Sequence, residues 1–141
     1  MPKLKQLITA LLILLSTSAV AQPDKDWWAC QGVASGGLKW EDGSWVPAGF
    51  KLTPPFVLMS DGDGLLTKES VGKVLNTDVH DLDCRKDDVV RSRISCSNTM
   101  GRMLYFNTKR AKGGWSTVFG TTNTGDSRDT VTVDAFECTK G

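Results

Sequence analysis

The chain has 141 residues, including 17 Lys and Arg, 16 Asp and Glu, one His and four Cys. This length allows one domain and excludes a barrel enzyme of the α/β type. With 40% hydrophobic and 23% charged residues the chain is neither disordered nor fibrous, and its net charge of +1 gives no overall indication of nucleic-acid or membrane-surface binding.

The first 21 residues have the pattern of a signal peptide. Basic side chains precede an apolar run over residues 7–15, and the segment ends on Ala19-Val20-Ala21. Signal peptidase needs small residues at these positions, so we predict cleavage after Ala21. The apolar run is about half of the roughly 20 residues that span a bilayer, so it predicts no stable membrane anchor. We therefore expect a periplasmic or secreted protein whose mature part, residues 22–141, is a single β-rich domain.

The four cysteines, Cys30, Cys84, Cys96 and Cys138, all lie in the predicted mature chain. An even number of cysteines in an exported protein predicts disulfides, and no two of them have the short spacing of a zinc site. Cys84 and Cys96 fall on the apolar faces of two predicted strands close in sequence, which favours their pairing. Cys30 and Cys138 would then join the first strand to the last. The other two connectivities stay open.

Strand signals dominate the first part of the mature chain. The first predicted strand covers residues 27–35 and ends at the two glycines that follow. Residues 38–46 predict a hairpin, because the Asp-Gly pair at 42–43 suits a two-residue turn with positive φ. This turn places Trp40 opposite Trp45. The two indoles could form a stacking platform for a sugar or a base, but we favour the packed face of a hairpin.

A short helix is expected in the middle of the chain. Residues 56–60 predict a strand, and Asp-Gly-Asp-Gly at 61–64 predicts a tight turn, with a weak calcium site as the alternative. Thr67 is a suitable cap for a helix over residues 68–75. Asn76 can end that helix.

Alternating apolar and polar residues predict the remaining strands. These cover residues 79–84, 90–96, 102–107, 115–121 and 130–138, with loops at 109–114 and 122–129. Together the signals predict an all-β fold with one short helix: a small antiparallel β-barrel or sandwich of about eight strands, stabilised by disulfides. A barrel is favoured because it removes strand edges. The layout resembles small exported β-barrels of the lipocalin-like and lysozyme-inhibitor kind, in architecture only.

Candidate catalytic residues are few, and we predict no metal site and no cofactor. His80 is the only histidine. It alternates onto the same strand face as Leu82 and Cys84, which predicts a buried structural imidazole. If all cysteines are paired, no thiol nucleophile remains. An enzyme is therefore not the favoured class.

Basic residues concentrate between Arg85 and Lys112, where eight of them accompany two acids, Asp87 and Asp88. If strand pairing aligns the basic side chains, they form a patch for an anionic partner, such as an acidic protein or an anionic component of the envelope. An ordinary solvated face is the simpler alternative. The candidate binding residues are Arg91, Arg93, Arg102, Lys109, Arg110, Trp40 and Trp45.

The predicted export, the predicted disulfides and the small number of candidate catalytic residues favour a non-enzymatic binding protein of the bacterial envelope. We expect a monomer that binds a protein partner in the manner of an inhibitor, and no nucleic acid. One alternative is a lipocalin-like carrier, which requires an apolar cavity for a small ligand. Another is a small hydrolase, which requires His80 at the surface within hydrogen-bond reach of an acid or a hydroxyl.

Overall fold

The computed structural model describes residues 25–118 and 130–141, so the predicted signal peptide and the predicted loop 122–129 lie outside the described residues. Within these ranges there are eight strands, one α-helix and one 3-10 helix. The strands are β1 (Trp27–Glu41), β2 (Ser44–Gly49), β3 (Phe56–Met59), β4 (Asp83–Lys86), β5 (Arg93–Ser97), β6 (Arg102–Asn107), β7 (Lys112–Thr117) and β8 (Thr130–Lys140). The helices are α2 (Lys68–Leu75) and the 3-10 helix η1 (Val79–Asp81).

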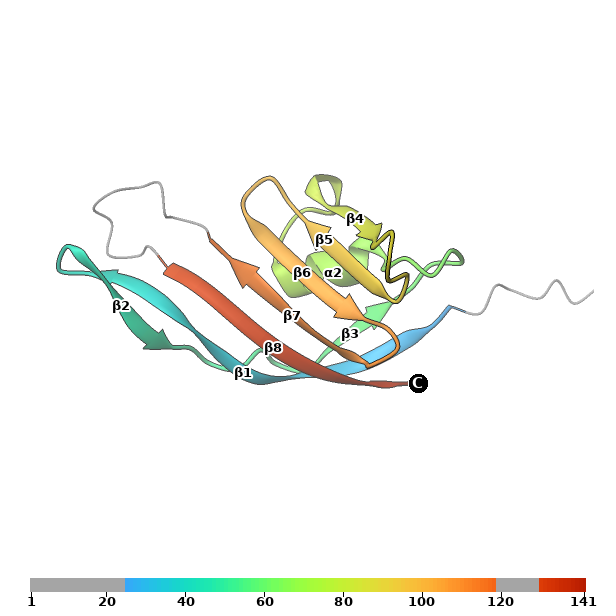
Figure 1. Ribbon diagram of the computed structural model, residues 1–141, viewed down its shortest axis with the longest axis horizontal. Coiled ribbons are helices and arrows are strands. Elements are labelled where there is room, and N and C mark those ends of the chain that lie inside the picture. The colour runs from blue at the N-terminus through green and yellow to red at the C-terminus, as the bar shows by residue number, and fades with distance from the viewer. Residues whose placement is uncertain (1–24, 119–129) are drawn as a thin grey trace, which may run out of the picture.

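The strands form one antiparallel sheet in the order β2-β1-β8-β7-β6-β5-β4, and β3 pairs with the start of β1 (Figure 1). The predicted all-β fold with one short helix is confirmed. In the described part of the sheet β2 and β4 each pair with one neighbour, so the sheet is open rather than closed. Helix α2 packs on one face of the sheet, behind β5 and β6 in Figure 1. We call this the helix face and the opposite side the outer face.

The core lies between the helix face and α2. Ile94, Leu104 and Phe106 alternate with exposed residues along β5 and β6, and they meet Val71 and Leu75 of the helix. Aromatic rings from the long strands complete this core, with edge-to-face contact between Trp28 and Phe106 at 5.2 Å and stacking between Phe106 and Phe136 at 6.0 Å. Each such buried side chain contributes about 1.5–3 kcal/mol to stability.

Two disulfides join directly opposed residues of neighbouring strands. Cys30 of β1 bonds to Cys138 of β8, and Cys84 of β4 bonds to Cys96 of β5, which is the favoured pairing. Both bonds indicate an oxidising, non-cytoplasmic compartment. Among the described residues, none of the helices has the length and apolar character needed to cross a membrane.

The hairpin between β1 and β2 forms as predicted. Asp42 and Gly43 have φ values of 50° and 82°, which gives the predicted two-residue turn, and Trp40 lies opposite Trp45. The two indole rings meet edge to face, 5.4 Å apart at 73°. The two indoles therefore pack against each other, as in the favoured packed face of a hairpin.

Helix α2 has the predicted bounds because its capping signals are local. The Thr67 side chain accepts a hydrogen bond from the backbone N–H of Ser70, and Asn76 ends the helix in the left-handed conformation with φ of 48°. The turn at 61–64 also forms, since Asp61 Oδ1 accepts hydrogen bonds from the backbone N–H of Asp63 and of Leu65.

The predicted bounds of several strands were wrong. β1 does not stop at the glycine pair but continues to Glu41, because β2 and β8 pair with its second half. The predicted strand 79–84 begins with η1, where Asp78 accepts a hydrogen bond from the backbone N–H of His80. The predicted strand 90–96 begins only at Arg93, because Asp87 holds the preceding residues in a turn.

The predicted loop 109–114 is shorter than expected, since β7 begins at Lys112. Gly113 and Gly114 therefore lie inside a strand. A Cβ atom at Gly113 would overlap both the Phe136 ring and the carbonyl oxygen of Tyr105. Glycine is needed at this position for close packing and not for a loop.

Candidate functional site

Small side chains cover the middle of the outer face. Cross-strand register places four residues in one row over β5, β6, β7 and β8: Ser95, Tyr105, Gly114 and Ala135. Tyr105 is the only large side chain of this row and is 56% exposed. The neighbouring row is polar and consists of Arg93, Asn107, Lys112 and Glu137.

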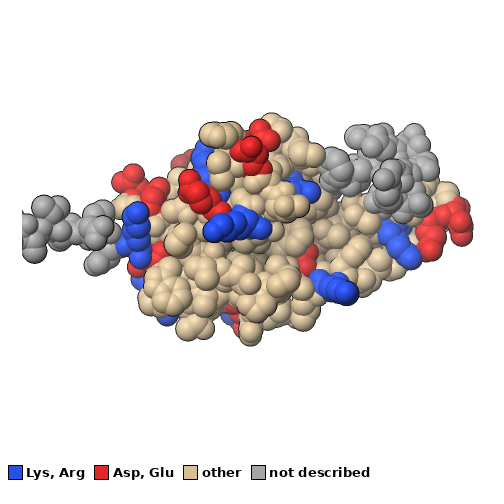
Figure 2. All heavy atoms as spheres, turned by 180° about the vertical axis from the view of Figure 1, so that it is seen from behind, with Lys and Arg blue, Asp and Glu red and all other residues tan. Residues whose placement is uncertain are grey.

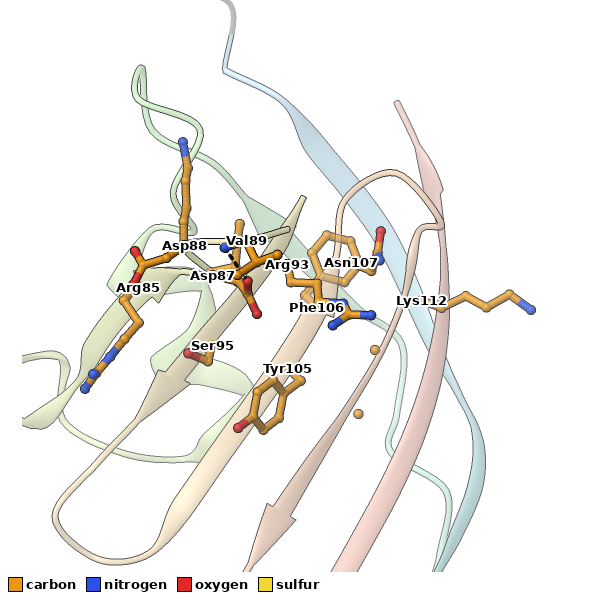
Figure 3. A pocket seen from close by; sticks show the side chains of 14 residues that line it. Arg85, Asp87, Asp88, Val89, Arg93, Ser95, Tyr105, Phe106, Asn107 and Lys112 are labelled. Atoms are coloured by element: carbon orange, nitrogen blue, oxygen red, sulfur yellow. Dashed lines mark hydrogen bonds between the residues drawn. The ribbon is translucent and has the colours of Figure 1, made fainter. Parts of the chain in front are cut away.

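An open pocket of about 720 Å³ lies over these two rows, beside the turn that connects β4 to β5 (Figure 3). Arg93 of β5 and Tyr105 of β6 project from the sheet on the pocket side. The floor includes the backbone of Gly113 and Gly114, where no side chain fills the space. Asp87, Asp88 and Val89 of the connecting turn also line the pocket.

Asp87 holds the shape of that turn. Its Oδ1 accepts hydrogen bonds from the backbone N–H of Val90 at 2.7 Å and of Val89 at 2.9 Å. These bonds lower the pKa of Asp87 below its usual value. Burial opposes them in part, and the positive charge of Arg93 adds a smaller lowering. The carboxylate therefore stays charged at neutral pH and keeps the turn in place.

Most cations of the pocket already have partners. Arg85 forms an ion pair with Asp83 at 2.8 Å, and Lys112 forms one with Glu137 at 2.7 Å. The ammonium group of Lys86 donates to the carbonyl oxygen of Asp63. Arg93 differs from them: within residues 25–118 and 130–141 no hydrogen-bond acceptor or acid pairs with its exposed guanidinium. Arg93 is therefore the cation that a ligand can use.

The predicted basic patch is only partly assembled. Thr108 donates its backbone N–H to the carbonyl oxygen of Ser92 at 2.9 Å, which brings two turns together at one end of the sheet. The candidates at that end are Arg91, Arg93, Lys109 and Arg110. The helix side of the molecule, seen from behind in Figure 2, carries basic and acidic side chains interspersed among uncharged atoms, without a large area of one sign.

Three candidate residues do not join this cluster. Arg102 begins β6 at the opposite end of the strand and lies on the helix face, where its Nη1 donates to the carbonyl oxygens of Leu75 and Asn76. Its charge is used at the C-terminus of α2, where a cation is favourable, so its proposed place in the patch was wrong. Trp40 and Trp45 lie on the hairpin of β1 and β2, away from the pocket.

Arg102 is instead expected to contribute to stability. Arg102→Gln removes the bonds to Leu75 and Asn76 and lowers the free energy of unfolding by about 1–2 kcal/mol. Urea denaturation followed by tryptophan fluorescence measures this. Lys109→Gln, which changes an exposed turn residue, should stay within about 0.5 kcal/mol of the parent chain. Equal stability of the two variants would contradict the capping role.

The outer face also has an exposed apolar stripe at the hairpin end. Register across β2, β1 and β8 places Trp45 beside Trp40 and places Pro47, Leu38 and Val131 in the next row, while Val133 lies one row further on β8. Val133 is 57% exposed, and Leu38 and Trp45 are 38% and 37% exposed. None of residues 36–49, all of which the structure describes, is buried. We call this set of six residues the apolar stripe.

The structure provides little for catalysis. His80 lies in η1 and is exposed, so the prediction of a buried imidazole was wrong. In the described ranges its imidazole has no hydrogen-bond partner, and no three metal-ligating side chains lie together. Both pairs of cysteines are oxidised, so no free thiol is present. The described pocket is open, and charged groups such as Arg93 and Asp87 line it together with apolar ones, whereas a carrier of a small apolar ligand requires an apolar cavity that surrounds the ligand.

Sequence reasoning did not select Tyr105, Asn107 or Gly114 as site residues. The alternation of β6 gives a usable signal, since Leu104 and Phe106 face the core and Tyr105 must then face outward. Comparison of the chain with models of known protein families, with characterised proteins and with solved structures found no match.

Proposed function

We propose that this chain is a non-enzymatic binding protein of the bacterial envelope or of the extracellular space, and that it binds a protein partner through the outer face of its sheet. The disulfides support a compartment outside the cytoplasm. The proposed export rests on the signal-peptide pattern of the first 21 residues.

The observation that carries this proposal is the exposed apolar stripe. A sheet normally buries at least one face, and a soluble protein seldom exposes neighbouring apolar side chains on several adjacent strands. Here Leu38, Trp45 and Val133 are exposed on three strands of the outer face. A partner that covers them would bury aromatic and aliphatic area, which is the main source of binding energy at protein interfaces.

The pocket next to the stripe supports the same assignment. Aromatic and arginine side chains are the residues that most often dominate binding energy at interfaces. Tyr105 and Arg93 project from adjacent strands on the same outer face. An apolar area and a pocket with charged side chains on the same face suit a protein partner better than a small apolar ligand.

Photocrosslinking tests the proposed surface. With p-benzoylphenylalanine at Val133, the mature protein should crosslink one partner in envelope extract, and the same probe at Leu52 should not. Leu52 is a matched control because it is 52% exposed but lies in the loop after β2. Leu38→Asp should weaken binding of the identified, purified partner at least about tenfold, as expected for loss of a central apolar contact. Leu52→Asp should leave the affinity unchanged.

Two results would count against the proposal. One is equal crosslinking from positions 133 and 52. The other is the same partner affinity for the Leu38→Asp variant as for the parent protein.

A further inference from the structure

We propose that the pocket around Arg93 binds a single carboxylate of the partner, namely the side chain of an Asp or Glu, with an apolar neighbour of that residue packed on Tyr105. This inference rests on the proposed function and names the chemical group that the outer face recognises beside the apolar stripe.

The unpaired guanidinium of Arg93 is the first argument. Guanidinium groups bind carboxylates through two parallel hydrogen bonds, which gives both energy and direction. Acidic side chains of the same chain form ion pairs with Arg85 and with Lys112. In the described ranges no acid forms an ion pair with Arg93. An incoming carboxylate would therefore displace no existing ion pair at Arg93.

The acids beside the pocket argue for one negative charge and not for several. Asp87 is held charged by its bonds to the backbone of Val89 and Val90, and it is near enough to Arg93 for the two charges to interact. Asp88 also lines the pocket. These two acids repel any incoming anion, and the repulsion grows with the charge of that anion. One carboxylate on the one unpaired guanidinium is therefore favoured over a phosphate or a polyanion.

The floor of the pocket explains how a partner chain can reach Arg93. Gly114 and Ser95 flank Tyr105 in the same row, so the backbone of the sheet is accessible on both sides of the phenol ring. An extended segment can pass over this flat area, with one side chain directed at Arg93 and the next apolar one on Tyr105. Because the row of Ser95, Tyr105 and Gly114 lets a segment continue past Arg93 in both directions, a side-chain carboxylate is favoured over the C-terminal carboxylate of a chain.

The position of Lys112 and Asn107 adds selectivity. Both belong to the same polar row as Arg93, and both line the pocket. Asn107 Oδ1 also accepts hydrogen bonds from the backbone N–H groups of Lys109 and Arg110, so the turn holds this side chain in place. A carboxylate bound to Arg93 would then lie beside the fixed amide group of Asn107. This arrangement favours a planar polar group as the ligand.

A peptide titration tests the inference on the mature, disulfide-bonded protein. The probes are acetyl-Leu-Glu-Leu-Gly-amide, its Gln counterpart and acetyl-Leu-Gly-Leu with a free C-terminus. Backbone amide shifts in ¹⁵N spectra report the site. The Glu peptide should shift the signals of Gly113, Gly114 and Tyr105, and it should bind about tenfold or more tightly than the Gln peptide, as expected for a charge-assisted pair.

Variants of Arg93 and of a lysine outside the pocket separate the site from general charge. Arg93→Gln should abolish the preference for the Glu peptide, and Arg93→Lys should leave a weaker preference, because an ammonium group lacks the paired geometry. Lys51→Gln removes one positive charge from the exposed loop after β2, which does not line the pocket, and should leave the preference intact. Equal binding of the Glu and Gln peptides, or tighter binding of the free C-terminus, would overturn the inference.

The outcome is distinguishable from failure of the proposed function. If the Glu peptide does not bind but Leu38→Asp still weakens the partner, the surface stands and the carboxylate assignment is overturned. If the Glu peptide binds at Gly113 and Gly114 while Leu38→Asp has no effect, the carboxylate site is supported and the apolar stripe is not the binding surface.

Discussion

Replacing both Cys30 and Cys138 by alanine is expected to lower the free energy of unfolding by about 4–5 kcal/mol. These cysteines are 108 residues apart in sequence, so their bond closes most of the described chain into one loop. In the chain-entropy view a loop of about 100 residues restricts the unfolded chain by roughly 4.7 kcal/mol. The bond also fixes β1 against β8, which is central to the sheet. Urea unfolding under non-reducing conditions measures the loss.

The second disulfide is the matched control. Cys84 and Cys96 are 12 residues apart and also oppose each other on neighbouring strands, so their removal changes the same chemistry with a much smaller loop. The double alanine variant at these positions should lose about 3 kcal/mol. Losses of equal size for the two pairs would show that loop length does not set the contribution of either bond.

Gly113→Ala is expected to destabilise the protein by about 3 kcal/mol, at the upper end of the range for overpacked cores. The added methyl group would overlap both the Phe136 ring and the carbonyl oxygen of Tyr105, so neither the ring nor β6 can stay in place. Thermal unfolding followed by circular dichroism measures the change.

Gly49→Ala provides the comparison for this variant. Gly49 also lies in a strand, but an added Cβ atom there has nothing within 4 Å. Its stability should stay within about 0.5 kcal/mol of the parent chain. A Gly113→Ala variant as stable as Gly49→Ala would mean that β7 and Phe136 can separate without cost, against the packing described above.

The elements predicted correctly depend on local signals. The hairpin turn at Asp42 and Gly43 and the caps of α2 at Thr67 and Asn76 are determined by residues within a few positions of one another. The disulfide pairing followed from alternation, since both Cys84 and Cys96 were placed on apolar strand faces, and they are direct partners in the sheet.

The wrong element predictions arose where the residue pattern fits two kinds of local structure. Between Val79 and Leu82 the pattern fits a 3-10 turn as well as a strand, because Asp78 caps the turn and Leu82 alone is buried. His80 therefore lies outside the sheet. Conversely, Gly113 and Gly114 resemble a loop, and only the distant Phe136 explains why a strand has glycines there.

The candidate site was the least predictable part, because it depends on contacts between distant segments. The sequence stretch from 85 to 112 contains both Arg93, which lines the pocket, and Arg102, which does not, and its charge count could not separate the two. Only the position of α2 shows that Arg102 is used at the helix end. Likewise, which cations are paired within the protein is visible only in three dimensions.

Pro47 has a consequence for how this sheet meets other chains. Among the described strands that have a free edge, β2 is the longest, with six residues against four each for β3 and β4. In a two-residue hairpin the residues that flank the turn, here Glu41 and Ser44, form a hydrogen-bonded pair, so alternation directs the nitrogen of Pro47 to the free edge. A strand that pairs with this edge would find the proline ring where it needs an N–H donor. Fibre-like stacking of copies is thereby interrupted at the edge nearest the exposed indole of Trp45.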